Sequence, residues 1–158
     1  MKAATITEIK KELKFRSSEE LILLCLRLSR FKIENKELLT YLLFESENEE
    51  AFIKGIKEEI DQQFWEINTN SYFYIKKSVR KILRGIKKYS RYSPKKETEV
   101  ELLLYFCQSL KDFTPPIRSN VTLKNLYLRQ IEFITKKVSL LHEDLQYDYT
   151  LELDALQL

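Results

Sequence analysis

Lysine and arginine side chains are concentrated in one short stretch of this chain. Ten of them lie between residues 76 and 96, and this interval contains no Asp or Glu. Cationic groups spaced by three and four residues share one side of a helix, where they can contact phosphates or carboxylates. We predict that residues 76–96 form the contact surface of the protein. The side chains expected to contact an anionic partner are Lys77, Arg80, Lys81, Arg84, Lys87, Lys88 and Arg91.

Several interpretations of this basic stretch are open at the level of sequence. The cations could bind nucleic-acid phosphates, and four tyrosines near its ends could stack on unpaired bases. These are Tyr72, Tyr74, Tyr89 and Tyr92. The cations could instead attract an acidic protein or an anionic membrane surface. They could also be neutralised by residues 45–66, which hold eight acidic and two basic residues. Charge runs are usually solvated faces, which favours neutralisation.

Residue patterns that support catalysis or metal binding are absent. His142 is the only histidine, which excludes metal motifs built on two histidines, and we expect it to face solvent. Gly55 and Gly85 are too far apart for a phosphate-binding loop, and we expect them to permit close helix contact. Cys25 and Cys107 form no CxxC pair and are expected to be buried. We predict a protein that is not an enzyme, with no catalytic, cofactor-binding or metal-binding residue and no cofactor.

The elements that position the basic stretch should all be helices. The chain has 158 residues, 44% of them hydrophobic, but only two Gly and three Pro. Sheet proteins of this size need more turn residues than that. We predict one all-α domain over residues 1–158 with about seven helices. It would be an irregular bundle of helical hairpins or a short α-solenoid, similar to HEAT-like folds in outline only.

Apolar residues spaced by three and four locate most of these helices. Residues 21–26 carry no charge, which predicts that the helix ending near Phe31 lies centrally in the core. Asn35 is expected to cap the next helix, and the short link predicts that the two form an antiparallel hairpin. Further helices are expected at about residues 5–14, 48–68, 71–92 and 97–113.

The longest predicted helix runs without a break from about Asn120 to Tyr147. Its apolar residues alternate steps of four and three, which is a heptad seam. Two neighbouring helices of the same chain would bury this seam, and the alternative is self-association with a second copy. The seam residues are Tyr127, Ile131, Ile134, Val138, Leu141 and Leu145. The last residues, 148–158, are predicted to be either a loosely ordered or a docking tail.

Two parts of the sequence resemble each other. Residues 29–31 read Ser-Arg-Phe and residues 90–92 read Ser-Arg-Tyr, and residues 37–41 align with residues 101–105. Each copy would be a helical hairpin, so the chain could have arisen by duplication. The alternative is chance, because leucine-rich helices align easily.

No apolar run reaches membrane-spanning length, and the first residues lack the apolar core of a signal peptide. Two cysteines in apolar surroundings suit a reducing compartment. We therefore predict a cytoplasmic protein without membrane insertion. Its predicted function is that of a non-enzymatic interaction or scaffold module whose basic helix contacts an acidic protein partner. The alternative is a nucleic-acid-binding protein that uses the same helix.

Overall fold

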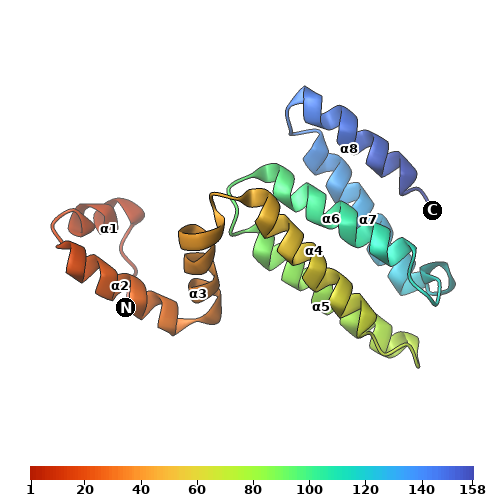
Figure 1. Cartoon of the computed structure of the whole chain (residues 1–158), viewed down its shortest axis with the longest axis horizontal. Coiled ribbons are helices and arrows are strands. Elements are labelled where there is room, and N and C mark those ends of the chain that lie inside the picture. Colours follow the sequence, from red (N-terminus) through yellow and green to blue (C-terminus); the bar gives the residue numbers. More distant parts are fainter. The chain divides into compact units, whose positions relative to one another are not determined.

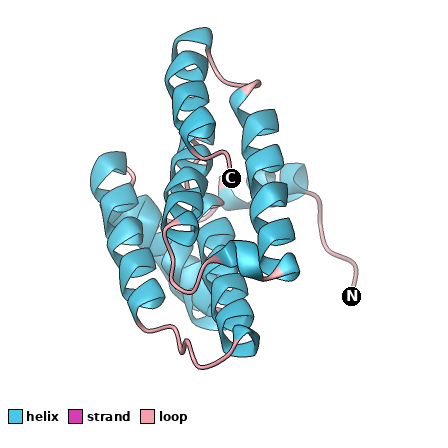
Figure 2. Ribbon diagram, turned by 90° about the vertical axis from the view of Figure 1, so that its right-hand side faces the viewer, coloured by secondary structure: helices cyan, strands magenta, loops and turns pink.

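A computed structural model describes all residues from Met1 to Leu158, and its regular structure is entirely helical (Figure 2). It contains eight α-helices, which confirms the predicted all-α class. The chain folds into two compact units, Met1–Phe44 and Glu45–Leu158. We call them the N-terminal unit and the C-terminal unit and describe each by itself. The grouping of all residues into one domain stays a prediction.

The N-terminal unit contains α1 (Ile6–Leu13), α2 (Ser18–Phe31) and α3 (Ile33–Thr40), with a π-helical turn at Tyr41–Glu45 at its boundary. Both α1 and α2 begin with a capping box, in which a hydroxyl and a glutamate satisfy free backbone amides. In α2 the Ser17 backbone N–H donates to Glu20 Oε2 at 2.8 Å, and the Glu20 N–H donates to Ser17 Oγ at 3.2 Å. These helices are thus started by local hydrogen bonds.

One prediction for this unit is wrong. Helix α2 was expected at the centre of a core, yet no side chain of α1, α2 or α3 is buried. Only Tyr41 is buried within residues 1–44, because so few residues cannot surround an apolar helix. Helices α2 and α3 are separated by Lys32 alone, and they contact each other where the chain bends between them (Figure 1). The antiparallel arrangement expected of this pair stays a prediction.

Asn35 does not cap α3 as predicted, because the helix starts two residues earlier and has Lys32 at its N-cap position. The Asn35 side chain instead donates from Nδ2 to the Leu28 carbonyl at 2.8 Å, which ties α3 to the end of α2. The pairs α2–α3 and α5–α6, compared above as copies, therefore differ in how they are joined. Duplication stays a prediction.

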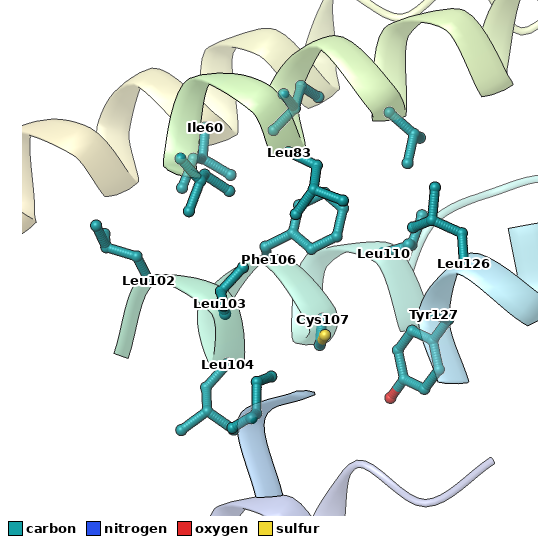
Figure 3. Close-up of a cluster of buried hydrophobic side chains, with 14 of the residues drawn as sticks. Ile60, Leu83, Leu102, Leu103, Leu104, Phe106, Cys107, Leu110, Leu126 and Tyr127 are labelled. Carbon is teal, nitrogen blue, oxygen red and sulfur yellow. The ribbon is translucent and has the colours of Figure 1, made fainter. Parts of the chain in front are cut away.

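The C-terminal unit contains α4 (Glu49–Trp65), α5 (Tyr72–Ser90), α6 (Lys96–Lys111), a 3-10 turn (Ile117–Ser119), α7 (Val121–Val138) and α8 (Glu143–Ala155). Helix α6 packs against α4, α5 and α7 and lies between them (Figure 1). Phe106 and Cys107 of α6 lie inside the core with Leu83 of α5 and Tyr127 of α7 around them (Figure 3). The core of the protein is therefore built around α6.

The predicted unbroken helix from Asn120 to Tyr147 is wrong. Helix α7 ends at Val138, and α8 starts at Glu143 with His142 at its N-cap. His142 is exposed, and its Nδ1 accepts a hydrogen bond from the Asp144 backbone N–H at 3.3 Å. The turn lets α8 fold back on α7, which buries apolar residues that a longer straight helix would leave in water.

Helix α8 is fixed by contacts at its end. The Tyr127 hydroxyl donates to the Leu156 carbonyl at 2.5 Å, and Lys111 Nζ donates to the Ala155 carbonyl at 2.8 Å. These bonds satisfy carbonyls that the last helical turn leaves without partners. Leu153 and Leu156 are buried. Residues 148–155 are thus part of a helix packed on the core.

The small residues singled out in the sequence have different environments. A Cβ added at Gly55 or Gly85 would meet no atom within 4 Å, so the expected close helix contact at these glycines is wrong. Cys107 is buried as expected, and burial raises the pKa of its thiol to about 12. Cys25 is exposed, contrary to expectation, because α2 has no core around it. No helix has the length and apolar character needed to cross a membrane.

Candidate nucleic-acid interface

Helix α5 separates apolar and cationic side chains onto opposite sides. Ile75, Val79, Ile82 and Ile86 recur at steps of four and three and are at most 2% exposed. This stripe packs against α4 and α6. The opposite side of the helix faces solvent and carries basic side chains but no acidic one. The core thereby holds the cations outward on a rigid element.

Six of the seven predicted contact side chains are exposed, and the seventh, Lys88, is half-buried. Helical geometry places Lys77, Lys81, Arg84 and Lys88 along one ridge of the solvent side and Arg80 and Lys87 along another. Arg91 follows at the C-cap of α5. The structure therefore brings the predicted residues together on one face. We call the set Lys77, Arg80, Lys81, Arg84, Lys87 and Arg91 the α5 basic face.

No side chain of the α5 basic face forms an ion pair. Several carboxylates of the preceding acidic helix α4 and of its C-cap, Glu66, have other partners. Asp61 accepts from the Tyr105 hydroxyl at 2.7 Å, and Glu66 accepts from the Gln62 amide at 2.6 Å. Direct neutralisation by α4, which the sequence favoured, is thus not observed for these six cations.

A shallow groove of about 630 Å³ runs along the basic face. Leu83 and Phe73 provide apolar lining, and cations form the rest of its surface. At the side toward α7, Lys87 Nζ lies 5.3 Å from the centre of the Phe133 ring. Lys137 approaches the same ring at 5.2 Å and pairs with Glu99 at 2.9 Å. The groove therefore combines positive charge with the exposed ring of Phe73, while Leu83 belongs to the core.

The four tyrosines proposed for base stacking are placed differently from one another. Tyr72 and Tyr89 are half-buried, and their hydroxyls donate to the Pro116 carbonyl and to Glu59, each at 3.2 Å. The half-buried Tyr92 packs its ring against Tyr89, with the centroids 6.1 Å apart. Tyr74 alone is exposed. The structure thus supports only this tyrosine as an accessible stacking platform.

Sequence reasoning missed two accessible aromatic residues. Phe73 is 67% exposed and packs edge-on against Tyr74, with ring centroids 5.5 Å apart. Trp65, at the end of α4, is 86% exposed. Phe73 lies three, four and seven residues before the cations at 76, 77 and 80, so helical spacing alone could have placed it on the basic face.

The residues of the predicted self-association seam are mostly covered by other parts of the same chain. Tyr127, Ile134 and Val138 are buried in the core of the C-terminal unit. Ile131, Leu141 and Leu145 are half-buried, and Leu141 and Leu145 lie beyond the end of α7. Self-association through this seam stays a prediction.

A second groove, of about 500 Å³, lies between α6 and α8. Lys57 pairs with Glu101 there at a distance of 2.6 Å between Nζ and Oε1. Partial burial, together with the nearby Glu101 carboxylate, raises the pKa of Glu152. No group of three or more His, Cys, Asp or Glu side chains is arranged to hold a metal ion.

Comparison with protein-family models, curated proteins and solved structures found no match to this chain.

Proposed function

We propose that the protein binds nucleic acid through the α5 basic face. The observation that supports this most strongly is the set of six exposed cations without a carboxylate partner. Cations with no ion pair of their own can replace the counterions condensed on a phosphate backbone, which favours association. Helix α5 has 19 residues and extends for about 28 Å, so several successive phosphates fit along it.

The make-up of the face favours nucleic acid over an acidic protein. Protein interfaces are depleted of charge at their centre and enriched in apolar anchors. The centre of the α5 basic face is cationic, and its exposed large apolar side chains, Phe73 and Tyr74, are at one end. Arg80 and Arg84 can each present a planar fork to a phosphate. The acidic protein partner predicted from the sequence is therefore the second candidate.

The exposed aromatic residues favour a single strand over a duplex. Phe73 and Tyr74 lie in the first turn of α5, and Trp65 ends the helix before it. Stacking of an unpaired base on such a ring contributes about 1–3 kcal/mol and tolerates any base. A strand that follows the cations along α5 would reach these rings at the N-terminal end of the helix.

The test is fluorescence anisotropy with labelled single-stranded DNA, single-stranded RNA and duplex DNA over a range of salt concentrations. We expect a single strand to bind most tightly, with affinity falling steeply as salt rises. Contacts to about five phosphates would give a slope of about −3.5 in a plot of log affinity against log salt. Failure of every probe to bind at low salt would contradict the proposal.

Charge-reversal variants locate the binding surface. Lys81→Glu with Arg84→Glu should abolish binding at moderate salt and leave the helical circular dichroism unchanged. The matched control is Lys124→Glu with Arg129→Glu, which makes the same change in net charge at exposed positions of α7. Equal losses in both double variants would show that net charge, and not the α5 basic face, drives binding.

Polyglutamate separates the two candidate partners. Phe73→Ala with Tyr74→Ala should weaken single-strand binding while leaving the weak attraction to polyglutamate unchanged. Polyglutamate binding as tight as nucleic-acid binding, and insensitive to this double variant, would instead favour the acidic protein partner.

A further inference from the structure

The N-terminal unit exposes more apolar surface than a stable isolated fold of its size would. Of the 24 large hydrophobic side chains that are exposed in the whole chain, 16 belong to residues 1–44, although these are little more than a quarter of the sequence. Units of about 40 residues usually need disulfides, metals or oligomerisation to be stable. This unit has one cysteine and no histidine, so neither a disulfide within the unit nor a histidine metal site can supply that stability.

A groove of about 570 Å³ lies between α1 and α2. Leu23 and Leu24 of α2 and Ile9 and Leu13 of α1 provide its apolar lining. All four leucine and isoleucine side chains are at least 40% exposed, and Leu23 reaches 66%. Glu8, Glu12 and Arg16 also line it, so the groove is an apolar concavity with charged groups in its lining, of a kind that an amphipathic helix can fill.

Charged residues on the α2 side of this groove are arranged in a self-complementary order. Glu20, Leu23, Leu24 and Arg27 all line the groove, and their spacing places them on one face of α2. The carboxylate and the guanidinium are seven residues apart, which is two helical turns, so they lie nearly in line. Read along the helix, the face runs acid, leucine, leucine, cation.

If a second copy of α2 lies antiparallel to the first, its residues occur in the reverse order along the interface. Glu20 then faces Arg27 of the other copy, Arg27 faces the other Glu20, and Leu23 faces Leu24. This reciprocity is what a two-fold symmetric interface requires. Arg27 has no partner within the chain, and Glu20 is paired only at its own N-cap and with Arg16, at 3.5 Å. We propose that two copies of this protein associate through antiparallel α2 helices at the α1–α2 groove.

The proposal goes beyond nucleic-acid binding and does not depend on it. The interface uses α1 and α2, whereas the α5 basic face belongs to the C-terminal unit. A variant that separates the copies should therefore still bind nucleic acid through each chain. The interface also differs from the heptad seam of α7, which lies mostly within the core.

The test is the oligomeric state of the full chain, measured by sedimentation velocity and light scattering over a range of concentrations. We expect a dimer of the wild-type chain. Arg27→Glu turns two attractive contacts into two Glu–Glu contacts and should raise the dimer dissociation constant about tenfold or more. Lys36→Glu, on α3 outside the groove, makes the same charge change and should leave the dimer unchanged.

A rescue variant separates loss of pairing from loss of folding. Glutamine keeps the capping box of α2 but removes the charge, so Glu20→Gln combined with Arg27→Glu should recover part of the lost affinity. A monomer at every concentration would overturn the proposal. A dimer that is insensitive to Arg27→Glu, or an absence of rescue in a folded double variant, would also overturn it.

Discussion

Helices α2 and α6 are both strongly apolar, yet they have opposite environments. Helix α6 buries eight of its 16 residues, whereas α2 buries none of its 14. Helix α6 has α4, α5 and α7 around it, and α2 lies in a unit whose only buried residue is Tyr41. An apolar sequence thus favours burial of a helix, but whether the helix is buried depends on the other elements that pack around it. This contrast between the two units can be tested by experiment.

The largest contrast should appear in the reactivity of the two thiols. Cys25 on α2 is exposed, and Cys107 on α6 is fully buried with a pKa raised to about 12 by burial. Alkylation needs an accessible thiolate, so Cys107 should react only when the core opens. We expect Cys25 to react at least about a thousandfold faster at neutral pH, given typical domain stabilities of about 5 kcal/mol or more.

Mass spectrometry of peptides after timed alkylation measures both rates. Cys25 lies on the side of α2 away from Glu20 and Arg27, so association through the groove should not protect it. Similar rates for the two thiols would show that the core of the C-terminal unit is not closed, which would contradict the contrast.

Truncation of a phenylalanine should have very different costs in the two units. Phe106→Ala removes a ring that is 0% exposed and should lower the free energy of unfolding by about 3–5 kcal/mol. Phe31→Ala removes a ring that is 77% exposed and should change it by less than about 0.5 kcal/mol. Urea denaturation followed by circular dichroism measures both values. Equal changes in the free energy of unfolding would contradict the difference between the two units.

Loss of the N-cap of α2 should destabilise only the N-terminal unit. Ser17→Ala removes the hydroxyl that accepts the Glu20 N–H, at a cost of about 1 kcal/mol to α2. Because tertiary packing does not hold α2, we expect faster amide hydrogen exchange in α2 and unchanged exchange in α6. Ser17→Asp, which can still cap, is the control. Faster exchange of α6 in the same sample would argue against independent units.

The smallest expected effect concerns two carboxylates with opposite pKa shifts. The Ser17 backbone N–H lowers the pKa of Glu20, so its contribution to stability is present at neutral pH and lost as the pH falls through the lowered pKa. Burial, with Glu101 nearby, raises the pKa of Glu152, so its ionisation costs stability at neutral pH. That cost disappears in acid, where Glu152 is protonated in both folded and unfolded chains.

We therefore expect Glu152→Gln to raise the melting temperature slightly at neutral pH and to have no effect at acidic pH. Thermal melts of both chains at several pH values measure the difference. A gain that persists unchanged in acid would mean that the benefit comes from packing and not from charge.

The amino-acid sequence determined the local features of this protein. The paucity of Gly and Pro predicts an all-α chain, and steps of three and four locate α1, α4, α5 and α6 within a few residues of their bounds. The same spacing places the cations of α5 opposite its apolar stripe. Spacing can do this because helical faces depend only on residues within the same helix.

Tertiary structure decided which apolar helix faces are buried and which charged side chains form no ion pair. Helix α6 became the centre of the core and α2 did not, although their sequences are similarly apolar. The carboxylates of Asp61, Glu66 and Glu58 contact Tyr105, Gln62 and Lys54, and the α5 basic face has no ion pair. The break between α7 and α8 likewise depends on the surface of α7 to which α8 returns. These outcomes depend on packing between residues far apart in the chain, which a local spacing pattern does not contain.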